Sequence, residues 1–217
     1  MSARSTHTQV LGVADPIALS QAVALVRAGD VVAFPTDTVY GLGCDLWQEA
    51  AIARLYEAKE RPSRLAIPVL VASPQDAARI ALDLPATFAA LAARFWPGGL
   101  TLILRRRSEV PALLCAGGET VAVRMPDHAW VQSLAQALGG ALATTSANLS
   151  GRPAPVTADE ALADLTGRIP LLVAGGRCAG GVVSSIVDLA SDPPVLVRAG
   201  ALTLDILRQV LPTLVPC

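Results

Sequence analysis

The sequence predicts an α/β fold built on a mixed sheet, and three observations support this prediction. Short apolar runs alternate along the chain with segments of helical periodicity, an arrangement typical of α/β proteins. Some apolar runs follow one another with no helix between them, so we expect antiparallel as well as parallel strand pairs. Hydrophobic residues make up 53% of the chain, which is enough for a substantial buried core.

The chain of 217 residues is expected to form one domain, because no linker, repeat or low-complexity tract divides it. No apolar run reaches the roughly 20 residues that span a bilayer. The N-terminal segment MSARSTHTQVLG lacks the apolar centre of a signal peptide. The net charge of −1 gives no general attraction to nucleic acid, so any anion site must be a local concentration of basic groups.

The four cysteines are widely spaced and form no zinc-binding pattern with the two histidines. We therefore expect reduced thiols, a cytoplasmic location and no metal bound by the protein itself.

The chain begins with a helix expected between Asp15 and Gly29, followed by a buried strand over residues 31–34. A hydroxyl-rich loop over residues 36–43 comes directly after this strand. Open α/β sheets place ligands in such loops. An ordinary turn, in which Asp37 and its neighbour bond their own backbone, is an equal alternative.

The later elements are predicted from apolar periodicity and from capping residues. Helices are expected at 48–58, after Ser73, from 85 to about 94, from Asp127 to about 138, after the capping box at Thr157, and after Thr203. Strands are expected at 67–71, 100–104, 120–124, 141–145, 171–174, 182–189 and 195–198. The tail at 216–217 is expected to be loose.

Lys59 is the only lysine in the chain, and Arg61 follows it two positions later. An ammonium and a planar guanidinium can hold one anionic group from two directions. The alternative is a solvated helix end, where the helix dipole favours basic residues. A second basic run, at residues 105–107, is assigned to solvated surface.

Several predicted strands end in hydroxyl or guanidinium groups. These residues are Thr38, Arg124, Ser146, Ser184, Ser185 and Arg198. Together with Lys59 and Arg61 they suit a triphosphate and a carboxylate better than a metal or an oligosaccharide. Displacement at a phosphate asks least for a general base. The residues alone therefore predict an anion or nucleotide site on an α/β scaffold.

Six motifs extend this prediction by resemblance. They are FPTDTVYGLG, KERP, WPGGLTLIL, VAVRMPDH, TSANLSG, and SSIVDL followed by VLVRAG, and they cover roughly residues 16–206. The chain resembles the YrdC-like family of threonylcarbamoyl-AMP synthases, in its short single-domain type. The resemblance implies a twisted mixed sheet, flanked by helices, with a large concave basic cavity.

The resemblance also implies a reaction. L-threonine, bicarbonate and ATP form threonylcarbamoyl-AMP and pyrophosphate, and a separate transferase complex passes the threonylcarbamoyl group to the adenosine beside the anticodon of tRNA. The family implies that threonine is held by Thr38, Arg124, Thr144 and Ser184. It implies a nucleotide site formed by Lys59, Arg61, Thr120, Ser146, Asn148 and Arg198. Lys59 and Arg61 are the implied catalytic pair, Tyr40 lines the cavity, and Mg²⁺ is carried by the ATP phosphates.

The sequence departs from the family pattern at three places, and these leave substrate contacts open. Leu65 and Leu70 stand where many relatives have an asparagine and a histidine, and Ala154 stands where a serine is common. Two other functions remain as alternatives. One is a carbamoyl-adenylating domain related to hydrogenase maturation, and the other is a non-catalytic protein whose basic cavity contacts RNA.

Overall fold

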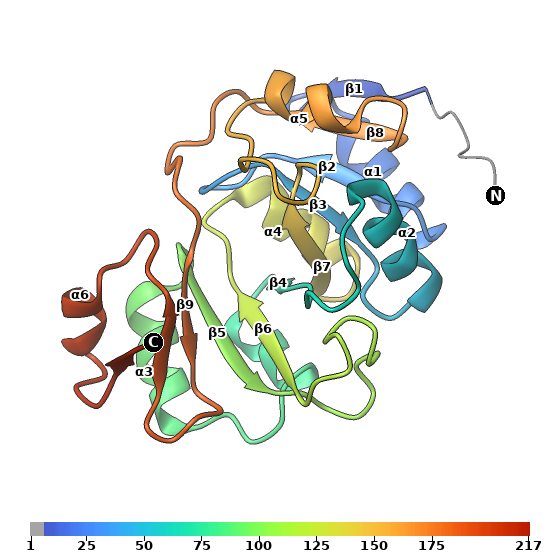
Figure 1. Ribbon diagram of the computed structural model, residues 1–217. Coiled ribbons are helices and arrows are strands. Elements are labelled where there is room, and N and C mark those ends of the chain that lie inside the picture. Colours follow the sequence, from blue (N-terminus) through green and yellow to red (C-terminus); the bar gives the residue numbers. More distant parts are fainter. Residues whose placement is uncertain (1–6) are drawn as a thin grey trace.

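The computed structural model describes residues 7–217, and the strands in this part of the chain form one continuous sheet (Figure 1). The strands are β1 (Gln9–Gly12), β2 (Val32–Phe34), β3 (Gly41–Cys44), β4 (Val69–Val71), β5 (Leu100–Arg105), β6 (Thr120–Arg124), β7 (Ala141–Ser146), β8 (Leu171–Ala174), β9 (Ser185–Asp188), β10 (Val195–Arg198) and β11 (Val215–Pro216). Their order across the sheet is β1-β8-β2-β3-β7-β4-β6-β5-β9-β10-β11. Parallel and antiparallel pairs both occur, so the predicted mixed sheet is confirmed.

Helices cover both faces of this sheet. They are α1 (Ala18–Arg27), α2 (Glu49–Lys59), α3 (Ala86–Phe95), α4 (Ala129–Ala137), α5 (Ala158–Leu165) and α6 (Leu204–Arg208), with a 3₁₀ helix, η1 (Pro74–Arg79). In β2, Val32 and Phe34 belong to one apolar cluster and Ala33 to another. Because side chains alternate along a strand, the two clusters lie on opposite faces. Helices α1 and α4 pack on the first cluster, and α2, α3 and α5 on the second.

The helix starts follow the capping rules in some places and depart from them in others. Thr157 and Glu160 form the predicted capping box of α5, and Thr203 caps α6. The expected cap at Asp127 is wrong, because His128 occupies the N-cap position and makes no side-chain cap bond. The helix after Ser73 exists, but it has 3₁₀ geometry.

The predicted loop at 36–43 is wrong in its second half, because Gly41–Cys44 forms β3 between β2 and β7. Glycine ordinarily weakens a strand. At Gly43 it makes room for an aromatic ring, since a Cβ there would lie 2.9 Å from the ring of Phe34. The strand is therefore compatible with its glycines, and the polar loop shortens to residues 35–40 between β2 and β3.

The ends of the chain also differ from the prediction. Strand β1 was not expected, and the tail expected to be loose forms β11, which pairs in parallel with β10. The Cys217 amide donates to the Leu196 carbonyl at 3.2 Å, which fixes the tail. The strand expected at 182–189 is shorter, since β9 covers only Ser185–Asp188. Residues 1–6 of the N-terminal segment lie outside the described residues.

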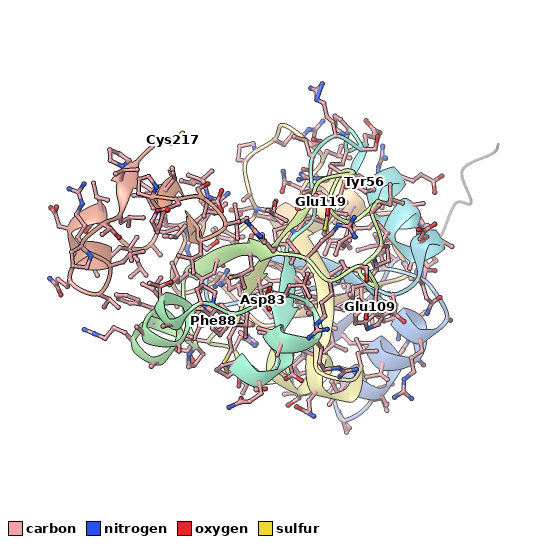
Figure 2. All side chains as sticks on the ribbon, turned by 90° about the horizontal axis from the view of Figure 1, so that it is seen from below. Tyr56, Asp83, Phe88, Glu109, Glu119 and Cys217 are labelled. Atoms are coloured by element: carbon pink, nitrogen blue, oxygen red, sulfur yellow. The ribbon has the colours of Figure 1, made fainter. Side chains whose placement is uncertain are left out.

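All four cysteines are free thiols. Cys44, Cys115 and Cys178 are buried, whereas Cys217 is exposed at the end of the molecule formed by the C-terminal elements (Figure 2). Within residues 7–217, no helix combines the length and the apolar character needed to cross a membrane.

Candidate active site

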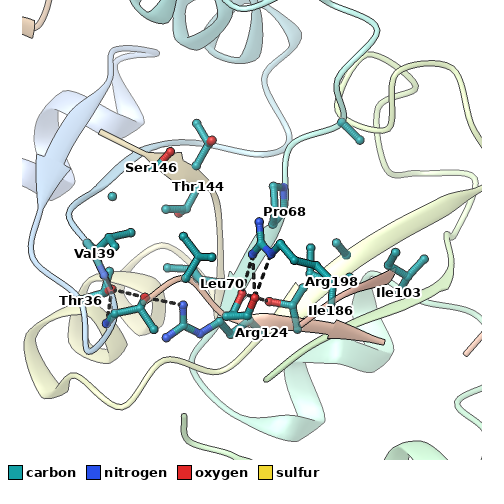
Figure 3. Close-up of a pocket in the computed structure, with 18 of the residues that line it drawn as sticks. Thr36, Val39, Pro68, Leu70, Ile103, Arg124, Thr144, Ser146, Ile186 and Arg198 are labelled. Atoms are coloured by element: carbon teal, nitrogen blue, oxygen red, sulfur yellow. Dashed lines mark hydrogen bonds between the residues drawn. The ribbon is translucent and has the colours of Figure 1, made fainter. Parts of the chain in front are cut away.

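A cavity of about 380 Å³ lies over the central strands (Figure 3). Residues from β3, β4, β5, β6, β7, β9 and β10 border it, together with the turn before β3, the segment between α2 and β4, and the segment before β9. Strand pairing explains why distant segments meet here. Gly41 at the start of β3 pairs with Ser146 at the end of β7, and Leu70 of β4 pairs with Arg124 at the end of β6, so residues distant in the sequence lie side by side.

The cavity brings together most of the residues expected from the sequence. Those that border it are Thr38, Tyr40, Arg61, Arg124, Thr144, Ser146, Ser184 and Arg198. Figure 3 shows Thr144 and Ser146 on one side of the view, and Arg124 and Arg198 near each other on another. Lys59, Thr120 and Asn148 are not among the bordering residues.

Arg124 ends β6 and uses all three of its nitrogens. Nε donates to the Gly98 carbonyl at 2.9 Å, and Nη1 donates to Thr38 Oγ1 at 2.8 Å. Nη2 forms an ion pair with Asp37 Oδ1 at 2.6 Å. Burial lowers the pKa of Arg124, and the Asp37 carboxylate opposes that shift. The guanidinium is thus a fixed cation whose partner is a carboxylate of the protein.

The turn between β2 and β3 is organised by Thr36. Its hydroxyl donates to the Val39 carbonyl at 2.8 Å and accepts from the Thr38 amide at 3.1 Å. In the described residues Thr36 therefore bonds the turn backbone, while Asp37 and Thr38 direct their side chains to Arg124. The sequence reasoning missed Thr36 and Asp37. The sequence signal that could have identified them is a carboxylate residue between two threonines, directly after a buried strand.

Residues 175–181, here called the glycine strap, lie against this turn. The Gly180 amide donates to the Asp37 carbonyl at 2.9 Å, and the Gly181 amide donates to the Thr38 carbonyl at 3.0 Å. The contact leaves no room for a side chain, because a Cβ at Gly180 would lie 2.6 Å from the Asp37 carbonyl oxygen. The backbone of the glycine strap is therefore packed directly against the backbone of Asp37 and Thr38.

Tyr40 fixes the other end of the glycine strap. Its hydroxyl donates to the Gly176 carbonyl at 2.7 Å and accepts from the Gly175 amide at 3.1 Å. Burial raises the pKa of Tyr40, so the phenol stays protonated and keeps both bonds. Tyr40 borders the cavity, and its hydroxyl bonds the strap.

Arg61 and Arg198 differ from Arg124 because each leaves one nitrogen without a protein partner. Arg61 donates through Nε and Nη2 to the carbonyls of Leu65 and Ala66. Arg198 donates through Nε and Nη2 to the Ser184 carbonyl, at 3.0 and 2.8 Å. Among residues 7–217, Nη1 of neither arginine has a partner, and neither forms an ion pair. Burial lowers the pKa of both arginines. The positive charge of nearby Arg124 lowers the pKa of Arg198 further.

Lys59 is the last residue of α2 and is only 1% exposed, so the alternative of a solvated helix end is wrong. Its ammonium donates to the carbonyls of Ser146 and Asn148. Its own carbonyl accepts from the Ser150 amide at 2.8 Å. Burial, with a smaller contribution from Arg61, lowers the pKa of Lys59 to about 7. Lys59 therefore holds the loop that follows β7.

The remaining expected residues lie around this centre. Asn148 Nδ2 donates to the Leu149 and Arg152 carbonyls, both at 2.8 Å, and its buried Oδ1 has no partner in the described residues. Thr120 begins β6, at the opposite end from Arg124, and pairs with Arg105. In the basic run at 105–107, Arg105 is exposed. The other two arginines donate to backbone carbonyls and serve the fold.

The lining suits an anionic ligand better than a metal held by protein side chains. None of the bordering residues in the described chain carries a carboxylate. No group of three or more histidine, cysteine, aspartate or glutamate residues is placed to hold a metal within residues 7–217. Of the departures from the family pattern, Leu70 borders the cavity and gives its wall an apolar part, whereas Leu65 and Ala154 do not border it.

Comparison with known proteins identifies the family. A family profile named Sua5_yciO_yrdC and described as "Telomere recombination" matches residues 24–200. The chain is 40% identical over 190 residues to threonylcarbamoyl-AMP synthase of Pyrococcus abyssi (strain GE5 / Orsay), which covers 88% of this chain and 56% of the relative. It is 42% identical over 205 residues to the protein of that name from Bacillus subtilis (strain 168), covering 94% and 59%.

A solved structure gives the same answer for the fold. The crystal structure of P. abyssi Sua5 complexed with L-threonine matches with a TM-score of 0.93 at 38% identity, over 97% of this chain and 63% of that one. The chain thus spans less than two thirds of the length of each of these relatives. The predicted α/β fold is confirmed, and the profile match and sequence identities show that the chain belongs to the Sua5/YciO/YrdC family.

Proposed function

We propose that this chain forms threonylcarbamoyl-AMP and pyrophosphate from L-threonine, bicarbonate and ATP. The observation that carries the proposal is a single cavity that combines a fixed Arg124–Thr38 pair with two further arginines. The first pair suits a carboxylate, and the second set suits phosphates. The names of the two curated relatives, and the L-threonine complex of the P. abyssi protein, support the assignment.

Within the cavity, threonine is assigned to the end that contains Arg124. The substrate carboxylate binds the Arg124 guanidinium, and the hydroxyls of Thr38, Thr144 and Ser184 complete the pocket. Each hydrogen bond to a charged group contributes about 1.5–3 kcal/mol. Two or three such bonds are sufficient for selective binding of a small zwitterion.

The nucleotide is assigned to the end that contains Arg61 and Ser146. Arg61 offers a free Nη1 for the phosphates, and Ser146 offers a hydroxyl at the end of β7. Arg198 lies near Arg124 and offers its free Nη1 where the two ends meet. Lys59 holds the loop after β7 in place. Direct contact of Lys59, Thr120 and Asn148 with the nucleotide stays a prediction.

The chemistry requires positioning more than proton transfer. The threonine amine and bicarbonate condense to a carbamate with loss of water, and a carbamate oxygen then attacks the α-phosphorus. Pyrophosphate leaves with the electron pair of the broken bond. Arg61 and Arg198 counter the charge that develops on the phosphoryl oxygens, and the cavity holds two anions together against their repulsion. Mg²⁺ carried by the triphosphate would neutralise part of its charge.

The biological setting belongs to the same proposal. The product is a mixed anhydride, which is reactive, so a transferase complex is expected to pass the threonylcarbamoyl group to adenosine beside the anticodon of tRNA. We place this reaction in the cytoplasm. We also propose that residues 1–217 work as one domain, with its core at about 16–206.

The test is pyrophosphate release by the purified chain in the presence of MgATP, L-threonine and bicarbonate. We expect release that needs both threonine and bicarbonate and is lost in Lys59→Ala and in Arg61→Ala. Release that does not need threonine would favour a carbamoyl-adenylating enzyme instead. RNA binding without any release would favour a binding protein, and either result would overturn the proposal.

A further inference from the structure

The three arginines of the cavity differ in how much of their charge the protein already balances. Arg124 forms a buried ion pair with Asp37 at 2.6 Å and is 7% exposed. Arg61 and Arg198 have no carboxylate partner within residues 7–217. One cavity thus contains an arginine with a balanced charge and two arginines with unbalanced charges.

The two proposed substrates also differ in how far their negative charge is balanced. Threonine presents one carboxylate beside its own ammonium, whereas a triphosphate carries several negative charges. A polyanion gains the most binding free energy from an arginine whose charge no carboxylate balances. A singly charged carboxylate can still bind an arginine with a balanced charge through hydrogen bonds. If Arg124 were also unbalanced, it would add a second free cation beside Arg198 at the amino-acid end, and phosphates could occupy that end. Selectivity between the ends therefore needs a penalty against the wrong anion.

We propose that Asp37 is a specificity-determining residue, which acts through Arg124 to keep polyanionic phosphates out of the amino-acid end of the cavity. The inference rests on the proposed function and assigns to Asp37 a role in sorting the two substrates.

The position of Asp37 fits a role through Arg124 and not a contact with substrate. Asp37 is not among the residues that border the cavity, although Thr36 and Thr38 on either side of it are. Its backbone is held by the Gly180 amide at 2.9 Å. The carboxylate therefore stays behind the guanidinium and faces it from outside the cavity.

Hydrogen-bond capacity supports the same assignment. A guanidinium has five N–H donors, and in Arg124 at least three are used by Gly98, Thr38 and Asp37. About two donors are left, which is the number that one carboxylate accepts. Arg61 and Arg198 each keep both donors of Nη1 in addition to their unbalanced charge.

The experiment measures which anions compete with threonine. L-threonine is titrated into the wild-type chain by calorimetry, alone and with saturating inorganic pyrophosphate, a polyanion that has no base. The titration is repeated with Asp37→Asn, which keeps the shape of the side chain and removes its charge. Asp30→Asn is the matched control, since Asp30 forms an ion pair with Arg54 away from the cavity.

In the wild type and in Asp30→Asn we expect pyrophosphate to leave the threonine affinity unchanged within about twofold. In Asp37→Asn we expect pyrophosphate to become a competitor of threonine. The preference for threonine over pyrophosphate at this end is expected to fall by about tenfold or more, as loss of one close charge pair implies.

Three outcomes would overturn the inference. Pyrophosphate could displace threonine from the wild type, a result that needs no variant to fold. Asp37→Asn could keep the wild-type pattern, or it could lose threonine affinity with no gain for pyrophosphate, which would leave Asp37 only a structural role. A wild type that neither binds threonine nor needs it for pyrophosphate release would instead overturn the proposed function, before any variant is compared.

Discussion

Arg124 donates hydrogen bonds to three different partners through its three nitrogens, and no other basic amino acid could make the same set of bonds. A lysine would supply one point charge in place of a planar fork. We therefore expect Arg124→Lys to raise the KM for threonine by about tenfold or more, which corresponds to one or two lost charge-assisted bonds. The KM for ATP is expected to change little. Steady-state pyrophosphate release checks both values, and an equal rise in the two would contradict the assignment of Arg124 to threonine.

Lys59 makes the stability of the fold depend on pH. Burial lowers its pKa from an ordinary 10.5 to about 7 in the folded state, so between these values the unfolded chain binds more protons. Stability is therefore reduced below about pH 7 and is regained as the pH rises towards 10.5. We expect urea unfolding of the wild type to show this gain between neutral and alkaline pH. In Lys59→Met this contribution is expected to disappear, and an unchanged pH profile in the variant would contradict the account.

At the residue scale, the sequence alone predicted the side chains whose chemistry suits an anion. Thr38, Arg124, Ser146, Ser184 and Arg198 could be proposed because each ends a predictable strand or starts a polar loop. Asp37 was considered only as a turn residue, since nothing in the sequence shows that Arg124 lies beside it. A buried ion pair between distant segments depends on how the strands are ordered, and the one-dimensional pattern does not contain that order.

The glycine strap is the element that sets the position of the turn carrying Thr38. A side chain at Gly180 would press on the Asp37 carbonyl, a backbone atom that cannot rotate away. We expect Gly180→Ala to lower the free energy of unfolding by about 1–3 kcal/mol, as overpacking does. We also expect it to raise the KM for threonine more than that for ATP. Urea unfolding and steady-state kinetics measure the two effects.

Gly12→Ala is the control for this variant, because its Cβ would have no atom closer than 4.0 Å. It is expected to leave stability and kinetics nearly unchanged. A Gly180→Ala protein with normal threonine binding would show that the strap is not needed to position the turn.

At the element scale, strands with a continuous apolar pattern are predictable from the sequence, whereas β1, β3 and β11 are not. Strands β5, β6 and β8 follow from their Val, Leu and Ile content. Strand β3 lies within a segment whose hydroxyl residues predict a loop, and two of its four residues are glycines that make room for the ring of Phe34 on the neighbouring strand. Strand β11 has two residues and exists only because β10 offers a free edge.

At the scale of the whole molecule, one continuous sheet predicts one cooperative unfolding unit. Trp130 lies beside Phe34 in the cluster under α1 and α4, and Trp96 contacts Phe88 in the other cluster. We expect variants that keep only Trp130 or only Trp96 to give coincident urea transitions by fluorescence. Separate midpoints would show that the two halves unfold independently and would contradict the single-domain proposal.

The cavity has a consequence for dynamics, because its walls come from segments that extend from Thr36 to Arg198 along the chain. Strands β3 and β10 both contribute to it although they are not neighbours in the sheet. A bound substrate is lost when either wall opens, so binding stabilises the closed form of both. Saturation with substrate is therefore expected to slow amide hydrogen exchange in β3 and in β10 to a similar degree, although the two strands do not pair with each other.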